Sequence, residues 1–542
     1  MLGLMQDWPL LIPKIIDHAA KQHGTREVVT RSVEGPITRT DYATIRSRAL
    51  KVAQRLTREG IRAGDRIATL AWNTARHLES WYGITGAGAI YHTVNPRLFP
   101  EQIVWIVNHA EDRMVLVDLT FVPLLEAIAA RLPSVERYIV LTDAAHMPKT
   151  TLKNAVAYED WIAEADGDFR WLELDERSAA GLCYTSGTTG DPKGVLYSHR
   201  SNVLHALAAS QIDCLAISAN TSILPIVPLF HANSWSIAFS APMAGAKMVM
   251  PGPKLDGASV YELLEAEQVT CTAGVPTVWA MLLQYIEKEQ KTFSTLKRLI
   301  VGGSAAPRAM IEAFEKRYGV EVIHAWGMTE MSPLGTVCSV KPVVSGLKDE
   351  ALYDLKVKQG FTPFLIEMKI TDDDGKELPW DGKTFGRLKV AGPAVVKAYY
   401  RGEGNVLDEE GFFDTGDVAT IDSHGYMAIT DRSKDVIKSG GEWISSIDLE
   451  NIACGHPDVA EAAVIGIRHP KWDERPLLVV VQKPERTVDK ADLLAFLSSR
   501  IAKWWLPDDV QIVSEIPHTA TGKINKVRLR EQFVDYRLPT AV

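Results

Sequence analysis

Hydrophobic and polar positions follow a repeated order along the chain. Three segments, which begin at residues 65, 113 and 296, each contain an apolar strand, a turn of small residues and an amphipathic helical stretch. Repeated units of this kind predict parallel sheets covered by helices, with ligands bound at the carboxyl ends of the strands. In the third segment, residues 299–301 read as a buried strand and residues 306–314 as a helix with one apolar face. Gly302 and Gly303 follow that strand, and their missing side chains leave room for a flat ligand.

The pattern changes after about residue 385. Strands separated by turns are predicted between residues 386 and 432, which indicates a smaller β-rich subdomain at about 340–432. From residue 433 onward, two helical patterns are mixed with two apolar, strand-like runs, as expected of a separate compact unit. The charged residues 431–434 predict an exposed junction between the two parts that can act as a hinge.

Composition places the chain among soluble globular proteins. It has 542 residues, 46% of them hydrophobic, and a mean hydropathy of -0.04, which fits roughly two to four domains. The net charge of -9 argues against a nucleic-acid partner, and no run of about 20 apolar residues predicts a membrane span. The N-terminus lacks the features of a secretion signal. The five cysteines are scattered without a CxxC pair, which argues against disulfides or structural zinc and predicts a cytoplasmic location.

The stretch YTSGTTGDPKG, from Tyr184 to Gly194, offers main-chain N–H groups, hydroxyls and a lysine, which together suit an anion. A P-loop requires its lysine after the second glycine and before Ser or Thr, whereas Lys193 precedes Gly194 here. We therefore interpret the stretch as a mobile loop that folds over a polyphosphate, with Lys193 as counter-charge. For this motif alone, an ordinary surface loop is the alternative.

Two further stretches carry groups that suit a nucleotide. AWGMTE, from Ala325 to Glu330, offers the flat face of Trp326 for a purine, the Thr329 hydroxyl for a phosphate and the Glu330 carboxylate for Mg²⁺. In FDTGD, Asp417 can accept hydrogen bonds from both hydroxyls of a ribose. The structural alternatives are a core tryptophan, a carboxylate at a helix start and a turn-forming aspartate.

Cations recur toward the C-terminus. Arg432 and Lys438 precede the Gly-Gly turn of DRSKDVIKSGGEWIS, and Lys523 lies on the Thr-Gly turn of PHTATGKINK. Solvated surface charges are the plain alternative for each of them.

Taken together and in this order, the stretches resemble the adenylate-forming superfamily of acyl-CoA synthetases, adenylation domains and luciferases. The resemblance extends from about residue 41 to residue 531, and YTSGTTGDPKG, FDTGD and TGKINK are highly specific for it. DRSKDVIKSGGEWIS is similar to the fatty-acyl-CoA ligases, within which the chain most resembles the 3-methylmercaptopropionate–CoA ligase group and the medium- and long-chain ligases. The implied fold is α/β: a large N-terminal AMP-binding domain of mixed sheets flanked by helices (1–432, including the β-rich subdomain) and a small α+β C-terminal domain (433–542) that carries Lys523 and rotates about a hinge.

The resemblance also implies roles for single residues in nucleotide binding and catalysis. Trp326 stands where the family usually has a tyrosine, so it keeps a stacking face but loses a hydroxyl. Glu330 and Thr185 are the implied Mg²⁺ ligands, and the implied catalytic residues are Lys523, Thr185, Glu330 and His231. Contacts with ATP or AMP are implied for Thr185, Ser186, Gly187, Thr188, Thr189, Gly190, Lys193, Gly302, Gly303, Ser304, Ala325, Trp326, Gly327, Met328, Thr329, Asp417, Arg432 and Lys523.

The acid and coenzyme A sites are implied in the same way. Amino-acid-activating relatives have an aspartate just after the aromatic residue near position 230, and its absence here argues against an amino-acid substrate. Trp235 is either a fixed wall, which suits a short acid, or a swinging gate, which admits a long chain; core packing is a further alternative. The expected acyl pocket comprises His231, Trp235, Val275, Thr277, Gly302, Gly327 and Pro333, with His231 at its carboxylate end; a hydrogen-bonded core histidine is the alternative for His231. The expected hinge and CoA face comprise Lys434, Lys438, Gly440, Gly441, Glu442 and Trp443.

The implied activity is ATP-dependent activation of a carboxylic acid as acyl-AMP, followed by formation of the acyl-CoA thioester, with ATP, Mg²⁺ and coenzyme A. We favour a short thioether or aliphatic acid such as 3-methylmercaptopropionate. Alternatives are a medium- or long-chain fatty acid, an adenylation enzyme that loads a separate carrier protein, and a non-catalytic nucleotide sensor. A luciferase-like side activity stays open. Relatives are often homodimers, so a homodimer is expected.

Overall fold

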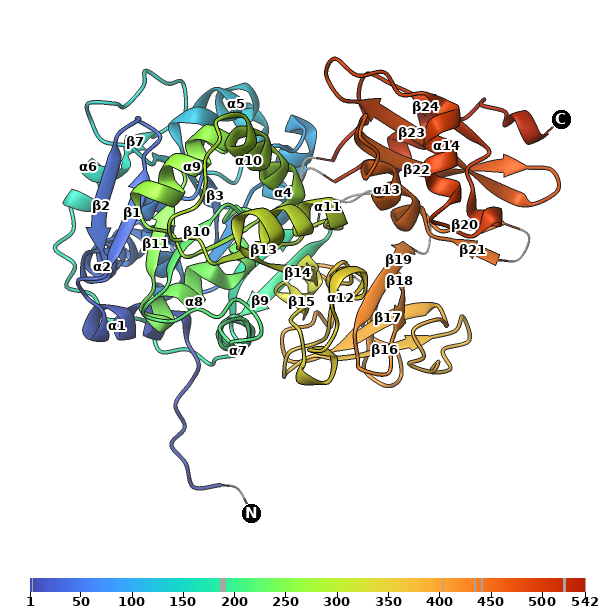
Figure 1. The fold of residues 1–542 in the computed structure, drawn as a ribbon. Helices are drawn as coiled ribbons and strands as arrows, with labels where there is room; N and C mark the ends of the chain where they lie inside the picture. Colours follow the sequence, from blue (N-terminus) through green and yellow to red (C-terminus); the bar gives the residue numbers. More distant parts are fainter. Residues whose placement is uncertain are drawn as a thin grey trace.

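The computed structural model describes the chain except residues 2, 186–191, 403, 433–434, 440–441, 520–522 and 542, and it describes no side chain for residues 432, 442 and 443. The described residues form four β-sheets. Three sheets lie in one large body, and the fourth lies in a smaller C-terminal unit beside it (Figure 1). A search of the described residues finds no helix with the length and apolar character of a membrane span.

An eight-stranded sheet has the order β15-β14-β13-β12-β10-β11-β1-β2. Its inner strands are parallel, and β15 and β2 pair antiparallel at the two edges. In β13, Leu299 and Val301 pack with helices α9–α11, whereas Ile300 faces the central core, as the two-residue period of a strand requires. The elements are β1 (Glu27–Arg31), β2 (Ile37–Asp41), β10 (Ser222–Pro225), β11 (Lys247–Met250), β12 (Cys271–Gly274), β13 (Arg298–Val301), β14 (Glu321–Gly327), β15 (Leu334–Val337), α9 (Gly257–Ala266), α10 (Pro276–Lys288) and α11 (Arg308–Glu312).

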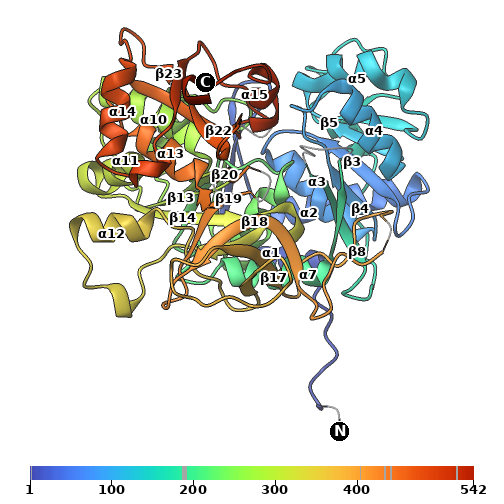
Figure 2. The same cartoon turned by 90° about the vertical axis from the view of Figure 1, so that its right-hand side faces the viewer.

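A seven-stranded sheet, in the order β7-β6-β5-β3-β4-β8-β9, lies on the other side of the central core. In β5, Leu116 faces this core, whereas Val115 and Val117 pack with α4 and α5 on the outer face. The central core is filled by α1–α3, α7 and α8, so helices and sheets alternate in layers (Figure 2). The elements are β3 (Arg66–Leu70), β4 (Ile90–Thr93), β5 (Met114–Val117), β6 (Arg137–Val140), β7 (Val156–Ala157), β8 (Ala179–Tyr184), β9 (Gly194–Ser198), α1 (Ile12–Gln22), α2 (Tyr42–Arg58), α3 (Ala75–Gly86), α4 (Pro100–Ala110), α5 (Val122–Ile128), α6 (Tyr158–Ala163), α7 (His199–Ala209) and α8 (Ile237–Ala244).

Two smaller sheets complete the described chain. The antiparallel sheet β16-β17-β18-β19 forms the β-rich part, and β21-β20-β23-β22 with β24 forms the C-terminal unit. In Figure 2, α15 lies on the side of this unit that faces α4 and α5, and the Arg528 guanidinium lies 5.9 Å from the centre of the Phe99 ring. The elements are β16 (Glu367–Thr371), β17 (Gly386–Ala391), β18 (Phe413–Ile421), β19 (Met427–Arg432), β20 (Ile437–Ser439), β21 (Glu442–Ile444), β22 (Val459–His469), β23 (Asp473–Gln482), β24 (Asp509–Ile512), α12 (Asp349–Lys356), α13 (Ser446–Cys454), α14 (Lys490–Ser498) and α15 (Lys526–Gln532).

The predicted α/β fold class is confirmed, including mixed sheets and a C-terminal α+β unit. The helix expected over residues 306–314 begins later, at Arg308, because Pro307 precedes it in extended backbone, and it continues as a π-helical turn over Ala313–Arg317. The predicted junction at 431–434 is described only in part, since residues 433–434 are outside the described chain. The division at residue 432 therefore stays a prediction.

Candidate active site

The glycine-rich stretch closes the β8–β9 hairpin. The Thr185 N–H donates to the Lys193 carbonyl at 2.9 Å, and the Lys193 N–H donates to the Thr185 hydroxyl at 3.2 Å. These two bonds fix both residues at the base of the loop. The predicted phosphate contacts Ser186, Gly187, Thr188, Thr189 and Gly190 lie outside the described residues.

Tyr399 lies between the loop lysine and the predicted metal ligand. The Lys193 ammonium is 4.8 Å from the centre of the Tyr399 ring, and the Tyr399 hydroxyl donates to Glu330 Oε1 at 2.9 Å. Burial raises the pKa of Tyr399, and the charge of Glu330 raises it further, so the hydroxyl keeps its proton and remains a donor. The sequence analysis missed Tyr399, because its neighbour Tyr400 offers the same side chain and no motif distinguishes the two.

Glu330 fits a Mg²⁺ that arrives with a nucleotide. Glu330 is only 8% exposed, and its backbone carbonyl accepts a hydrogen bond from the Val396 N–H at 2.8 Å. The bond from Tyr399 holds the carboxylate itself in place. Mg²⁺ usually takes one or two protein carboxylates and fills its other positions with water and substrate phosphates. A single fixed carboxylate, linked through Tyr399 to Lys193, suits that demand.

Trp326 connects the predicted adenine and ribose positions. Its indole N–H donates to Asp417 Oδ2 at 3.0 Å, and the β18–β19 register pairs Asp417 with Arg432. A Cβ added to Gly335 would lie 2.4 Å from the indole ring, so β15 packs directly on it. Trp326 is 9% exposed and belongs to the core of the small sheet. Most of its surface is thus packed as the core alternative predicted, and its N–H supplies a hydrogen bond to Asp417.

The predicted acyl-pocket residues meet the end of β13. A Cβ added to Gly302 would lie 2.8 Å from Trp235 Cη2, and one added to Gly303 would lie 3.1 Å from Val275 Cγ1. Gly303 also has φ +85°, which favours glycine. Trp235 therefore covers the backbone of Gly302 in this structure.

The remaining residues of these two predicted sites divide between buried and exposed positions. A Cβ added to Gly327 would lie 2.2 Å from the Pro333 carbonyl oxygen, which in turn accepts from the Met328 N–H at 3.0 Å. The buried residues are Ala325, Thr329 and Pro333, the partly buried ones are Gly327 and Met328, and the exposed ones are Thr277 and Ser304.

Trp235 is carried by a left-handed turn. The residues Ala232–Ser236 all have φ between 45° and 62°, a region that costs non-glycine residues roughly 1–2 kcal/mol each. Buried hydrogen bonds offset this cost: Asn233 accepts from the Tyr91 hydroxyl and donates to Asn202, each at 3.2 Å, and Ser234 donates to a backbone carbonyl at 2.7 Å. The sequence predicted pocket residues here but not this turn.

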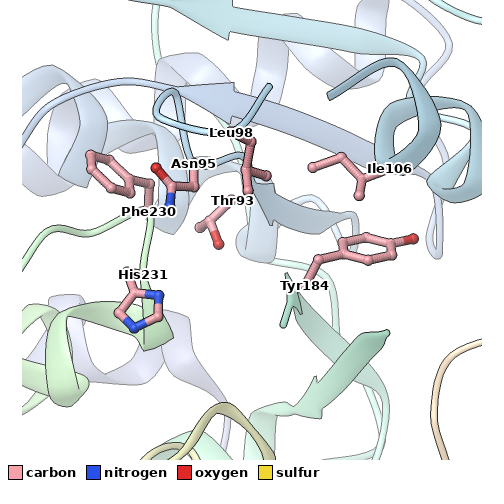
Figure 3. Close-up of a pocket in the computed structure, with 7 residues that line it drawn as sticks. All are labelled: Thr93, Asn95, Leu98, Ile106, Tyr184, Phe230 and His231. Carbon is pink, nitrogen blue, oxygen red and sulfur yellow. The ribbon is translucent and has the colours of Figure 1, made fainter. Parts of the chain in front are cut away.

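His231 lies directly before this turn, at one side of a pocket (Figure 3). Burial lowers the pKa of His231 to about 4, and the positive charges of Lys523 and Arg97 contribute. The imidazole is therefore neutral near pH 7. The pocket is lined by Thr93, Asn95, Leu98, Ile106, Tyr184, Phe230 and His231.

Lys523 is held in a short hairpin. Its N–H donates to the Thr519 hydroxyl at 3.2 Å, and its carbonyl accepts from the Thr519 N–H at 2.7 Å. Three residues later, the Lys526 ammonium contacts Glu450 at 2.8 Å and Asp431 at 3.9 Å. Because Asp431 belongs to β19, this cluster ties the tail to the large body.

The predicted CoA face is described only in part. Lys438 is exposed, its N–H donates to Glu474 Oε2 at 3.0 Å, and β20–β21 pairing sets it opposite Trp443. The positions Lys434, Gly440 and Gly441 lie outside the described residues, as do the side chains of Arg432, Glu442 and Trp443.

The fold and two family models define the class of this protein. The model of the AMP-binding enzymes matches residues 16–400, and that of the AMP-binding enzyme C-terminal domain matches residues 448–523. The chain therefore belongs to the AMP-binding enzyme family, and the predicted superfamily resemblance is confirmed.

Several known proteins are similar over the full length. A 3-methylmercaptopropionyl-CoA ligase of Ruegeria pomeroyi is 49% identical over 535 residues, which is 99% of each chain. A long-chain-fatty-acid–CoA ligase of Thermus thermophilus is 45% identical over 535 residues, 98% of this chain and 97% of its own. In fold, the chain resembles an anthranilate CoA ligase in complex with anthranoyl-AMP, with a TM-score of 0.86 at 24% identity over 97% of this chain and 99% of that one.

Proposed function

We propose that the protein is an ATP-dependent acid–CoA ligase that converts a carboxylic acid into acyl-AMP and then into an acyl-CoA thioester. The supporting observation is the arrangement around Tyr399, whose hydroxyl donates to Glu330 Oε1 at 2.9 Å and whose ring centre lies 4.8 Å from the Lys193 ammonium, as a site for magnesium and phosphates requires. Full-length similarity to proteins named as CoA ligases supports the same reaction. The first step brings two anions, the carboxylate and ATP, together, and the lysines of the predicted site supply the positive charge that this step needs.

In that step the carboxylate attacks the α-phosphate of ATP, and pyrophosphate leaves. Lys523 neutralises the approaching charges, and Lys193 with the β8–β9 loop holds the outer phosphates. Glu330 would hold a Mg²⁺ that arrives with the phosphates, and this ion would supply further positive charge. His231 is neutral and contacts the acid, and its imidazole does not change protonation near pH 7. The thiol of CoA then displaces AMP.

We infer a short thioether or aliphatic acid, such as 3-methylmercaptopropionate, as the substrate. Trp235 lies against Gly302, as a fixed wall of a short pocket would, and the relatives at 49% and 48% identity carry the 3-methylmercaptopropionyl name. A medium- or long-chain acid is the second candidate. It is favoured by the relatives at 46% and 45% identity and requires the left-handed turn to move Trp235 aside.

The test is a series of acids of increasing chain length with the purified full chain, ATP, Mg²⁺ and free CoA. Pyrophosphate release without CoA reports acyl-AMP formation, and thioester and AMP report the complete reaction. We expect the highest kcat/KM for short acids. A maximum of kcat/KM at eight or more carbons would instead identify a medium- or long-chain fatty acid as the substrate. Acyl-AMP without any thioester would instead favour loading of a carrier protein, and no ATP cleavage with any acid would refute the function.

We further infer that residues 433–542 turn about Lys434 between the two half-reactions, so that the Lys438–Trp443 face replaces Lys523 at the acyl group. The Lys434→Pro variant, which fixes φ, is expected to keep acyl-AMP formation and lose thioester formation. A cytoplasmic location is supported by the five cysteines, all of which are unpaired. The homodimer rests on the family resemblance, and light scattering of the purified chain tests it.

A further inference from the structure

A buried histidine joins the left-handed turn to the segment that follows Glu330. His205 on α7 is 3% exposed. Its Nδ1 lies 2.7 Å from the Ser236 hydroxyl, and its Nε2 lies 2.8 Å from the Leu334 backbone nitrogen. Ser236 ends the turn, and its hydroxyl lies 3.3 Å from the Ser332 carbonyl oxygen.

These contacts allow only one arrangement of protons. The Leu334 N–H can only donate, so Nε2 accepts and Nδ1 carries the ring proton. Nδ1–H therefore donates to Ser236, whose own hydroxyl proton points to the Ser332 carbonyl. Burial lowers the pKa of His205 to about 3, which keeps the ring neutral and preserves this direction. The result is one continuous chain of hydrogen bonds from β15 to the turn and back.

Each end of the chain carries a part of the candidate site. Ser236 directly follows Trp235, whose ring covers Gly302. Ser332 and Leu334 follow Glu330, which is held by Tyr399. Ser332 is itself fixed, since its hydroxyl donates to the Ala394 carbonyl at 2.9 Å. A shift of either end lengthens a buried hydrogen bond, which is costly away from water.

We propose that His205 is a positioning residue that makes the acyl pocket and the nucleotide segment change together. The inference rests on the proposed function, because it assumes that Trp235 borders the acid and that Glu330 borders the ATP phosphates. Binding of ATP at the Glu330 segment then acts on the turn through His205, and the affinities for acid and nucleotide depend on each other.

The same helix provides a matched control for simple packing. His199 is fully buried, accepts a hydrogen bond from the Ile12 N–H at 3.2 Å, and has its pKa lowered by burial to about 4. It thus resembles His205 in burial, charge state and the side chain removed on mutation, but its partner is helix α1. A purely structural role predicts equal effects at the two positions.

The experiment measures coupling by isothermal titration calorimetry. The Kd of α,β-methylene-ATP with Mg²⁺ is determined without acid and with saturating 3-methylmercaptopropionate or octanoate. For the wild type we expect the better acid to change this Kd by about fivefold or more. The coupling is the ratio of the Kd without acid to the Kd with acid. We expect His205→Leu to bring this ratio close to 1. His205→Gln, which can donate and accept, should keep part of the coupling, and His199→Leu should keep all of it.

Ser236→Ala provides a second test that leaves the contact between His205 and Leu334 in place, and it decides the matter if His205→Leu does not fold. It should also lower the ratio. The inference is overturned if the wild type shows no coupling, if both His205→Leu and Ser236→Ala keep the wild-type ratio, or if His199→Leu removes it equally. If the wild type releases pyrophosphate but these tests fail, only the coupling is refuted. If the wild type releases no pyrophosphate with any acid, the proposed function is refuted.

Discussion

Tyr399 offers a prediction whose size follows from two separate interactions of one side chain. Its hydroxyl donates to Glu330 at 2.9 Å, and its ring supports the Lys193 ammonium at 4.8 Å. Tyr399→Phe removes the first interaction and keeps the second, whereas Tyr399→Leu removes both. The pair of variants therefore separates the metal side of the site from the phosphate loop.

The expected magnitudes follow from the chemistry of the interaction that each variant removes. A hydrogen bond that orients a metal-binding carboxylate is worth about 10–100-fold in metal affinity or activity, so we expect that decrease in kcat/KM for MgATP with Tyr399→Phe. A cation–π interaction at an exposed lysine contributes about 0.5–1 kcal/mol. Because Lys193 is exposed, this energy corresponds to only about a two- to fivefold change in rate. Tyr399→Leu should therefore lower kcat/KM for MgATP by about that factor beyond the decrease in Tyr399→Phe.

The assay is pyrophosphate release without CoA, measured across Mg²⁺ concentrations, together with calorimetric binding of MgATP. Tyr400→Phe is the control, since this neighbouring ring lies beside His109 and Arg401. We expect Tyr399→Phe to need more Mg²⁺ for half-maximal rate and Tyr400→Phe to behave as wild type. An unchanged Mg²⁺ requirement in Tyr399→Phe, or an equal change in the control, would refute the reasoning.

Three further predictions concern the tail and the buried histidines. Lys523→Ala should slow acyl-AMP formation at least ~10²–10³-fold, as removal of a charge-stabilising donor does; a near wild-type rate of pyrophosphate release would remove this lysine from the mechanism. Lys526→Met leaves Asp431 and Glu450 without their buried ammonium, and breaking such a pair costs about 3–5 kcal/mol. Denaturant unfolding should show that decrease in stability, Lys526→Arg should restore part of it, and unchanged stability contradicts the cluster's role. Burial lowers the folded-state pKa of five histidines below the unfolded value of 6.5, so unfolding takes up protons, and their contribution to stability, full above pH 6.5, falls as the pH drops toward about 4. Thermal unfolding at pH 7.5 and 5.5 checks this, and a higher midpoint at pH 5.5 would contradict it; the five are His77, His199, His205, His231 and His324.

Much of the fold is predictable because burial leaves a periodic trace in the sequence. The apolar run at residues 299–301 became β13, whose alternate side chains enter two different cores. The parallel sheets follow from the repeated strand–turn–helix order. Boundaries are less exact: the helix expected over residues 306–314 begins only at Arg308 and continues as a π-helical turn over Ala313–Arg317.

The site was only partly predictable, because some of its groups act through long-range contacts that leave no local pattern. The prediction for Lys523 rests on a motif and a family resemblance, not on any property of its own segment. Arg97, His205 and Tyr399 belong to no motif, and each gains its importance from partners more than 60 residues away in the chain. The left-handed turn at Ala232–Ser236 is equally invisible, since it is stabilised by buried partners rather than by glycine.

The register of the small sheet bears on how an enzyme with two half-reactions keeps its intermediate. Asp417 pairs with Arg432 at the last position of the β18–β19 ladder, immediately before the residues at which the C-terminal unit is inferred to turn. In a rigid rotation, displacement grows with distance from the axis, so a ribose held there hardly travels. Lys523 belongs to the part of the chain beyond the proposed hinge and would move with it. In the proposed rotation, acyl-AMP can thus remain bound in one position while the residues that face its acyl group change.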